Sequence, residues 1–407
     1  MIMRSRLEAM GLPGWLILMG ALTAIGPLSI DMYLPAFPSI ASSLGAHSSE
    51  VERTLAAYLL GMASAQLVYG PLADRFGRKP PLYGAMLLYI VASAGCALAP
   101  SIEFLTVSRV FQAMGGAAGM VISRAVVRDH YNTQEAARAL SMLMLVMGIA
   151  PILAPLLGAQ VLSLVGWRGI FATITLLGIV LLWTLSKVMI ESLPRENQIK
   201  LSWGNILRTY AGLLAHRRFL AFALSGGLAS ATMFAYIVGS PRLFIEHFGA
   251  SPQTYGLLFG LNAFSLILGS QVSARILKHH TPMKILPWAL AGMMTAGLSA
   301  VILAISGTAT LQTMMGCMLV FMFCHGFVGP NSAALALSDQ GHQLGSASAM
   351  MGTLSISCGA LAGLLVSLMH APGPMPLALM MAGCTSLACL IGAIARRARS
   401  PIGRRFD

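Results

Sequence analysis

The sequence predicts an all-α integral membrane protein with twelve transmembrane helices. Of its 407 residues, 57% are hydrophobic and only 10% are charged, which is more apolar surface than the core of a soluble protein can bury. A spanning helix needs about 20 apolar residues, so twelve spans and short connections use the whole length. No room is left for a soluble catalytic domain.

The spans are predicted where long apolar runs are interrupted by charged or turn-forming residues. Arg4 and Arg6 precede a first run that is longer than the apolar part of a signal peptide and lacks a cleavage site, so we expect it to be retained as a span. The six cysteines lie inside apolar runs without metal-ligand spacing, and packing roles are expected for them. The predicted spans are residues 13–36, 51–72, 81–99, 102–124, 139–162, 168–190, 219–244, 254–276, 284–305, 310–334, 344–369 and 375–395.

The distribution of Lys and Arg predicts that both termini are cytoplasmic. With a cytoplasmic N-terminus, 22 of the 26 basic residues fall in inside connections or at their helix ends, three fall outside, and Arg109 lies within a span. This asymmetry follows the positive-inside rule. The net charge of +13 is therefore explained by topology, and because no sustained basic and aromatic stretch exists, nucleic-acid binding is not expected.

The longest polar interruption divides the spans into two sets of six. We predict an N-terminal six-helix half over 1–190, a cytoplasmic linker over 191–218, and a C-terminal six-helix half with a basic tail over 219–407. Two similar halves are typical of secondary transporters, whose substrate site lies between the repeats near the membrane midplane.

Two charged residues lie inside predicted spans at similar depths, Asp31 in the first and Arg109 in the fourth. Charges in hydrocarbon are costly and usually face a cavity or a partner. The two side chains are expected either to meet or to share a water-filled cavity, where a carboxylate could take up and release protons. The alternative is structural: Asp31 would cap the bend before Pro35 and Arg109 would bind backbone carbonyls. His325 could also relay protons, although a lone His inside a span is more often a hydrogen-bonded packing residue.

The connection after the second span reads GPLADRFGRK and resembles the G-x-L-A-D-R-x-G-R-K signature of the major facilitator superfamily. The resemblance implies a latch that holds the two halves together on the cytoplasmic side. The alternative is a positively charged turn without a gating role. The residues carried over as the latch are Gly70, Asp74, Arg75, Gly77, Arg78 and Lys79.

Two further segments resemble motifs of the same superfamily. The fourth span, with Arg109 followed by Gln112, is similar to its L-x-x-x-R-x-x-Q-G-x-G pattern, in which the Arg is associated with proton transfer. The fifth span resembles the antiporter signature, although two of the expected glycines are alanines here, and this resemblance implies export. Its small residues and prolines permit close, bent packing and are Gly148, Pro151, Pro155 and Gly158.

Within the superfamily, residues 29–38 (SIDMYLPAFP) resemble the first span of the bicyclomycin and chloramphenicol resistance (Bcr/CflA) branch. Arg128-Asp129 and residues 167–171 (WRGIF) are similar to that branch as well. The resemblance assigns proton and substrate coupling to Asp31 and Arg109. Weaker candidates for the substrate cavity, each of which is more simply explained as a packing residue, are Tyr58, Phe234, Tyr236, Asn262, Phe323 and Asn331.

We therefore expect a proton-coupled multidrug efflux antiporter of a bacterial inner membrane that exports small, mostly apolar antimicrobial compounds by alternating access. It would act as a monomer in the lipid bilayer, with drugs and protons as its ligands and with the proton gradient in place of a cofactor or metal. An exporter or importer of a metabolite such as an amino acid or a sugar is the alternative within transport. An enzyme would need clustered nucleophiles, and a channel would need a filter-like loop; neither is found in the sequence.

Overall fold

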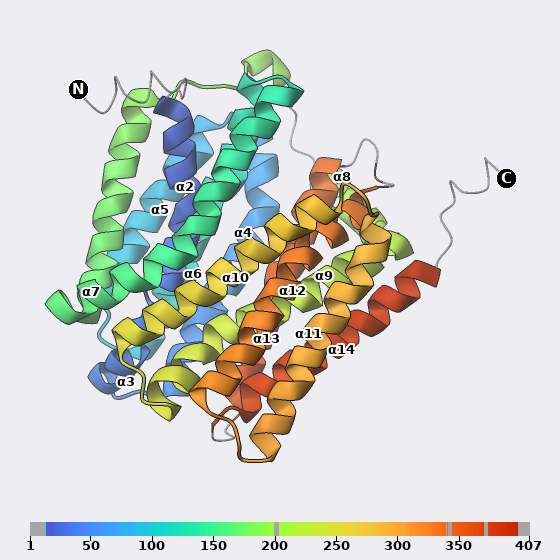
Figure 1. Ribbon diagram of the computed structural model, residues 1–407. Helices are drawn as coiled ribbons and strands as arrows, with labels where there is room; N and C mark the ends of the chain where they lie inside the picture. The colour runs from blue at the N-terminus through green and yellow to red at the C-terminus, as the bar shows by residue number, and fades with distance from the viewer. Residues whose placement is uncertain (1–13, 199–202, 339, 341–343, 370–372, 398–407) are drawn as a thin grey trace. The chain divides into compact units, whose positions relative to one another are not determined.

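The computed structural model describes residues 14–198, 203–338, 340, 344–369 and 373–397, and these residues are helical with short connections (Figure 1). They form two compact units: unit 1 comprises residues 1–201 and 251–260, and unit 2 comprises 202–250 and 261–407. Arg4, Arg6 and the basic tail after Arg397 lie outside the described residues.

The described residues of unit 1 form six α-helices and two short 3₁₀ turns, with the start of α10 added. Its α6 packs against α2, α4 and α5, and α7 packs against α2 and α5. The elements are α2 (Gly14–Asp31), η1 (Leu34–Ala36), α3 (Phe37–Leu44), α4 (Ser48–Phe76), α5 (Lys79–Ala97), α6 (Ile102–His130), α7 (Thr133–Val188) and η2 (Arg195–Asn197).

The described residues of unit 2 form seven further α-helices and one π-helical turn, and the first residues of α10 are assigned to unit 1. The helix α9 packs against α12, α13 and α14, while α11 packs against α12 and α14. The elements are α8 (Trp203–Ala215), α9 (Arg217–Pro241), η3 (Arg242–His247), α10 (Pro252–Ile276), α11 (Pro282–Ile305), α12 (Leu311–Leu337), α13 (Leu344–Leu368) and α14 (Met375–Arg397).

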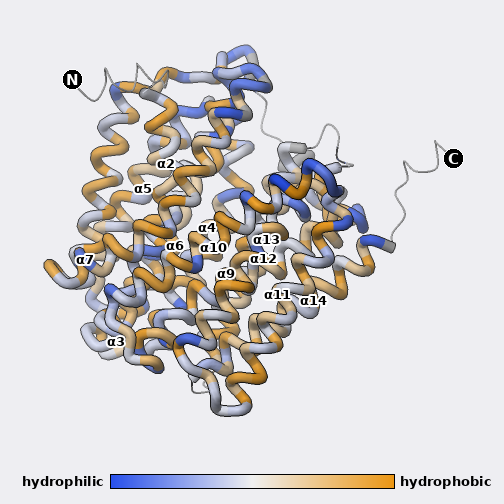
Figure 2. Tube along the Cα trace, in the orientation of Figure 1, coloured by the Kyte–Doolittle hydropathy of each residue, from blue (hydrophilic) through white to orange (hydrophobic). Residues whose placement is uncertain are grey.

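Eleven helical segments of the described chain are long and apolar enough to cross a membrane. In lipid, a helix satisfies all of its backbone hydrogen bonds internally, so apolar runs of this length fold as helices. Figure 2 shows the corresponding pattern, with hydrophobic residues along the helix bodies and hydrophilic residues mainly near their ends. The membrane-spanning, all-α fold class predicted from composition is confirmed.

The count of spans differs from the prediction at α7, which covers two predicted spans, 139–162 and 168–190, in one element of 56 residues. Gly166 interrupts this element with φ +74° and ψ −179°, a non-helical conformation that glycine adopts without a Cβ clash. The α7 element therefore consists of two helical parts that meet at Gly166.

The helix α2 ends where prolines follow in the sequence. Proline lacks the backbone N–H needed to continue a helix and disfavours helical geometry in the residue before it. Pro35 lies in η1 and Pro38 in the first turn of α3, so the chain from Asp31 onward runs through two short elements in place of one continuous helix. Asp31 is thus the last residue of α2.

Candidate functional site

Arg109 lies in the interior of unit 1, on α6. This helix begins after Ser101, whose hydroxyl accepts a hydrogen bond from the backbone N–H of Phe104 at 3.3 Å. Arg109 has no exposed surface and is among the largest fully buried side chains of the protein. Burying a guanidinium is costly unless its charge is compensated by surrounding groups.

Two hydrogen bonds hold the Arg109 guanidinium. Its Nη1 donates to the backbone oxygen of Ser29 at 2.9 Å and to Oε1 of Gln112 at 2.6 Å. Ser29 belongs to the last turn of α2, where backbone carbonyls have no partner inside the helix. Arg109 therefore ties α6 to the C-terminal end of α2, in the turn that ends at Asp31.

Three aromatic rings surround the rest of the guanidinium. Its central carbon lies 4.2 Å from the ring centre of Tyr58, 4.6 Å from that of Tyr33 and 5.8 Å from that of Phe171. The Nε and Nη2 atoms of Arg109 have no hydrogen-bond partner. The electron-rich ring faces stabilise the cation where hydrogen bonds are missing, and no carboxylate forms an ion pair with it among the described residues.

A chain of hydrogen bonds extends from Gln112 to α5 and back to α2. Gln112 Nε2 donates to Ser93 Oγ at 2.9 Å, and Ser93 Oγ donates to the Tyr89 carbonyl at 2.6 Å. The Tyr89 hydroxyl bonds the Ser29 hydroxyl at 2.7 Å. The partners of Arg109 are thereby fixed by three helices, which gives its guanidinium a defined position.

Asp31 is buried, with 3% of its surface exposed, at the end of α2. Among the described residues, no ion pair joins Asp31 to Arg109, and no hydrogen bond to the Asp31 carboxylate is found. Of the two predicted arrangements, direct contact of the two side chains is thus not present. Arg109 binds the Ser29 carbonyl instead, which is a contact of the kind that the structural alternative expected for Arg109.

Sequence reasoning did not assign site roles to Tyr33, Phe171 or Ser29, although all three surround Arg109. The sequence did contain an indication of these three residues, because each lies in a segment that resembles the Bcr/CflA branch. Glu52 was also missed: it is fully buried in the second turn of α4. Its place beside Arg53, at the edge of a predicted span, made solvent exposure the natural expectation.

In unit 2, three of the predicted cavity residues take part in buried polar contacts. Asn262 Nδ2 donates to the Tyr236 hydroxyl at 3.0 Å. Asn331 Nδ2 donates to Ser273 Oγ at 3.0 Å and to the Phe327 carbonyl at 2.7 Å. These contacts join α9 to α10 and α12 to α10.

The aromatic candidates in unit 2 lie elsewhere. Phe234 packs so closely against Gly359 that a Cβ on this glycine would overlap the ring. Phe323 lines a groove beside α11. His325 is buried in α12 with its ring parallel to that of Phe321 at 6.4 Å, and its Nδ1 has no hydrogen-bond partner.

The residues of the antiporter-like segment lie in the first helical part of α7, with Gly148 preceding Pro151 and Pro155. Gly158 faces the backbone that follows Asp31: a Cβ on Gly158 would overlap the carbonyl oxygen of Met32. Only a glycine permits this close approach of α7 to the end of α2. The segment therefore packs directly behind the Arg109 site.

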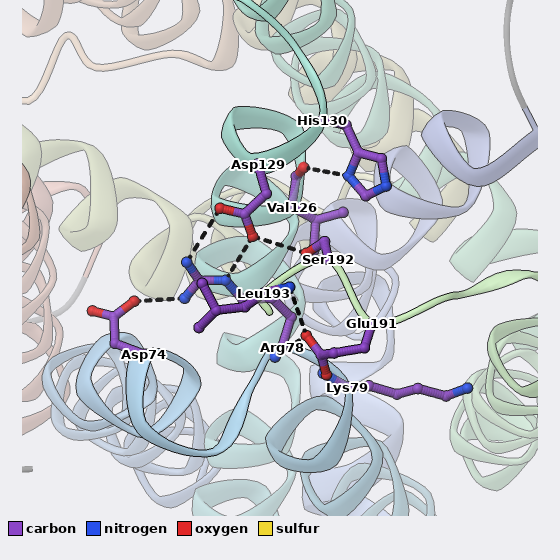
Figure 3. A network of polar contacts seen from close by, with 9 residues as sticks. All are labelled: Asp74, Arg78, Lys79, Val126, Asp129, His130, Glu191, Ser192 and Leu193. Atoms are coloured by element: carbon purple, nitrogen blue, oxygen red, sulfur yellow. Dashed lines mark hydrogen bonds and ion pairs between the residues drawn. The ribbon is translucent and has the colours of Figure 1, made fainter. Parts of the chain in front are cut away.

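A second polar cluster joins the connection between α4 and α5 to α6 and to the segment after α7 (Figure 3). Arg78 Nη1 bonds Asp74 at 2.5 Å, its Nε bonds Asp129 at 2.9 Å, and its Nη2 bonds the second Asp129 oxygen at 3.3 Å. The Ser192 hydroxyl donates to Asp129 at 2.8 Å. We call this the Arg78 cluster, and its members are Asp74, Arg78, Lys79, Asp129, Glu191 and Ser192.

Glu191 caps the N-terminus of α5 from a distant part of the chain. Its carboxylate accepts hydrogen bonds from the backbone N–H groups of Arg78 at 2.8 Å and Lys79 at 3.0 Å. These donors have no partner inside the helix, and the helix dipole favours a negative charge beside them. Gly77 has φ +86°, and a Cβ there would lie 2.7 Å from Glu191, so glycine is required at this turn.

The predicted latch residues are thus only partly brought together. Arg78, Lys79 and Asp74 belong to the cluster, and Gly77 makes room for it. Gly70 has open space around its Cα, and Arg75 is exposed with its guanidinium 6.0 Å from the Phe76 ring. Burial lowers the pKa of the Arg78 guanidinium, but its hydrogen bonds to Asp129 and Asp74 raise the pKa by more, so the group stays charged.

We expect Arg78→Ala to destabilise the protein while Arg75→Ala leaves its stability nearly unchanged. The Arg78→Ala variant loses charge-assisted hydrogen bonds, worth about 1.5–3 kcal/mol, and leaves the Asp129 carboxylate without its cation. The thermal midpoint of detergent-solubilised protein should fall by roughly 2–4 °C. Equal midpoints for the two variants would show that the cluster does not stabilise the fold.

The described residues contain no group of three His, Cys, Asp or Glu side chains that could hold a metal ion. The buried polar groups of the Arg109 site lack a nucleophile paired with a base. The class of protein that has this fold follows from its similarity to known proteins.

Residues 19–364 match the family model of the Major Facilitator Superfamily. The chain is 35% identical over 356 residues, 86% of this chain and 88% of the other, to an uncharacterized MFS-type transporter, YdgK, of Bacillus subtilis. It is 27% identical over 380 residues, 92% of this chain and 94% of the other, to a bicyclomycin resistance protein homolog of Haemophilus influenzae. A bacterial homolog of the human lysosomal transporter Spinster superposes with a TM-score of 0.74 at 14% identity, covering 95% of this chain and 98% of the other.

The chain belongs to the major facilitator superfamily of membrane transporters, and it is not an enzyme. Within that superfamily it is a member of the drug antiporter family that includes the bicyclomycin and chloramphenicol resistance proteins. Both statements confirm the resemblance identified from the sequence motifs.

Proposed function

We propose that this protein is a proton-coupled antiporter that exports small, mostly apolar antimicrobial compounds across a bacterial inner membrane by alternating access. Drugs and protons are its ligands, no cofactor is required, and the functional unit is a monomer. The relative from Haemophilus influenzae that is named for bicyclomycin resistance supports the choice of cargo.

The observation that carries the proposal is the environment of Asp31. An ionised carboxylate buried without an ion pair or hydrogen bond is costly, and protonation removes most of that cost. Opening the site to water on one side of the membrane would make the ionised carboxylate the more stable form again. Asp31 can therefore bind a proton in one state of the transport cycle and release it in another, as coupling to a proton gradient requires.

Arg109 provides the structural link between this carboxylate and the rest of unit 1. It binds the Ser29 carbonyl in the same helical turn as Asp31, and its guanidinium lies against the rings of Tyr33 and Tyr58. A change at the end of α2 that accompanies proton binding is thereby transmitted to α6. In this mechanism Arg109 positions α2 and does not itself carry the proton.

The proposed topology has twelve membrane crossings in two six-helix halves, with both termini in the cytoplasm. The interruption of α7 at Gly166 supports this count. An unbroken helix of 56 residues would be about 84 Å long at 1.5 Å per residue, which is more than twice the roughly 30 Å thickness of the hydrocarbon core of a bilayer. Two crossings joined at Gly166 resolve this excess. The Arg78 cluster then lies on the cytoplasmic side and holds the inner end of unit 1 together as one part of the gate.

Replacing Asp31 with Asn tests the proposal, because the amide imitates a permanently protonated carboxylate. In proteoliposomes with an imposed pH gradient, we expect chloramphenicol or bicyclomycin added to the wild type to induce proton movement and gradient-driven drug transport. Asp31→Asn should reduce both to the level of liposomes without protein. Its melting temperature should stay close to that of the wild type.

The matched control is Glu103→Gln, which removes an exposed carboxylate from the first turn of α6 and should leave coupling intact. Full proton coupling in Asp31→Asn would contradict the role of Asp31. Proton movement induced by a panel of amino acids or sugars, with no response to either drug, would instead identify a metabolite transporter.

A further inference from the structure

Unit 2 carries a groove that is separate from the buried sites described above. Its volume is about 460 Å³, within the range of about 300–1,000 Å³ that is usual for ligand sites. The last turn of α10, the first turns of α11 and the middle of α12 line it, and most of its surface is apolar. The residues that matter for its chemistry are Trp288, Phe323, Phe327, His280 and Lys284.

The apolar walls of the groove belong to helices long and apolar enough to span a membrane. Trp288 on α11 is 81% exposed, and Phe323 and Phe327 on α12 are partly exposed. Tryptophan is enriched where the acyl chains of a bilayer meet the headgroups. A partly open aromatic wall that extends from Trp288 to the middle of α12 is suited to an acyl chain and not to a water-soluble ligand.

The polar residues of the groove are basic. His280 lies in the connection before α11 and Lys284 in its first turn, one turn before Trp288. The sequence from Arg275 to Lys284 also contains Lys278 and includes no Asp or Glu. Basic pockets between spanning helices at the membrane surface bind the phosphate groups of anionic lipids.

We propose that this groove is a binding site for one anionic phospholipid of the surrounding bilayer. The lipid phosphate is bound by Lys284 and His280, and one acyl chain lies against Trp288, Phe323 and Phe327. The lysine supplies the preference for an anionic headgroup, and the aromatic wall supplies the preference for a lipid over free phosphate. The site shares no residue with the Asp31 and Arg109 site on which the proposed transport function rests, although Phe323 is also a weak candidate for the substrate cavity.

Quenching of Trp288 fluorescence by brominated lipid tests the proposal directly. The protein is reconstituted into phosphatidylcholine nanodiscs that contain a small fraction of either dibrominated phosphatidylglycerol or dibrominated phosphatidylcholine. The contribution of Trp288 is the difference between wild type and Trp288→Phe. We expect phosphatidylglycerol to quench Trp288 at a concentration about fivefold or more below that needed for phosphatidylcholine, which corresponds to the contribution of one basic residue at a membrane surface.

Variants separate a defined site from general attraction to a basic surface. The double variant His280→Gln with Lys284→Gln should lose the preference for phosphatidylglycerol. Lys278→Gln removes an exposed charge from the same connection, outside the groove. This variant should keep the preference for phosphatidylglycerol. Unbrominated phosphatidylglycerol should relieve the quenching, whereas inorganic phosphate should not.

Several outcomes would overturn the proposal. Equal quenching by the two brominated lipids, or an equal loss of preference in Lys278→Gln and in the double variant, would show that no specific site exists. Relief of quenching by inorganic phosphate would identify a phosphate site. Protection of Trp288 from both lipids would show that another protein surface, such as a second copy of the chain, covers the groove.

Discussion

Arg109→Lys should abolish coupled transport even though it preserves the positive charge. Arg109 Nη1 donates to Ser29 and Gln112 while the flat guanidinium lies against the Tyr58 ring, and a lysine ammonium, which is shorter in reach and not planar, cannot keep both kinds of contact. Each charge-assisted hydrogen bond is worth about 1.5–3 kcal/mol, so losing one changes the occupancy of the correct geometry by roughly tenfold to a hundredfold. The measurement is drug-induced proton movement in proteoliposomes.

Variants of Arg109 should lose transport activity without losing thermal stability. Arg109 has no carboxylate contact among the described residues, so its removal leaves no buried anion unpaired, and an apolar side chain of similar volume avoids the cost of burying a guanidinium. We therefore expect Arg109→Met to have no transport activity but a melting temperature close to or above that of the wild type. A large fall in the melting temperature would show that Arg109 is mainly a structural residue.

Gly158→Ala should impair both folding and transport, although it adds only one methyl group. The new Cβ would overlap the Met32 carbonyl oxygen, and because this is backbone, no side-chain rotation can relieve the contact. Overpacking of this kind costs about 1–3 kcal/mol or more. The resulting shift displaces the backbone next to Asp31, so we expect a lower melting temperature and loss of gradient-driven efflux.

The control for Gly158 is Gly84→Ala, the same substitution on the exposed side of α5. No atom lies within 4 Å of a Cβ built on Gly84, and alanine is the better helix former by about 1 kcal/mol. Gly84→Ala should therefore have wild-type transport and equal or higher stability. If Gly158→Ala behaves in the same way, the close approach of α7 to α2 is not needed for function.

The membrane fold could be predicted from the sequence because it depends on composition and on the length of apolar runs. The break near residue 166 was also visible, since the predicted spans end at 162 and resume at 168 around Gly166. The motifs identified the superfamily because a run such as Gly70 to Lys79 constrains both a turn and its charges. These features are local in the chain, and periodicity and composition report local features well.

The contacts of the site residues could not be predicted in the same way. Asp31 and Arg109 share a similar depth, but depth along two helices does not determine their rotation about their axes. The structure places Ser29, Tyr33 and Tyr58 around Arg109. The twelve-crossing count, the two-half division and the coupling roles of these residues stay predictions.

The capping of α5 by Glu191 has a consequence for the order in which the protein is made. The Glu191 carboxylate bonds the backbone N–H of Arg78 across 113 residues of sequence. At a synthesis rate of about 5–20 residues per second, roughly 6–23 s pass between the two positions. During that interval the first turn of α5 lacks this cap, so the Arg78 cluster can close only after nearly all of unit 1 has left the ribosome.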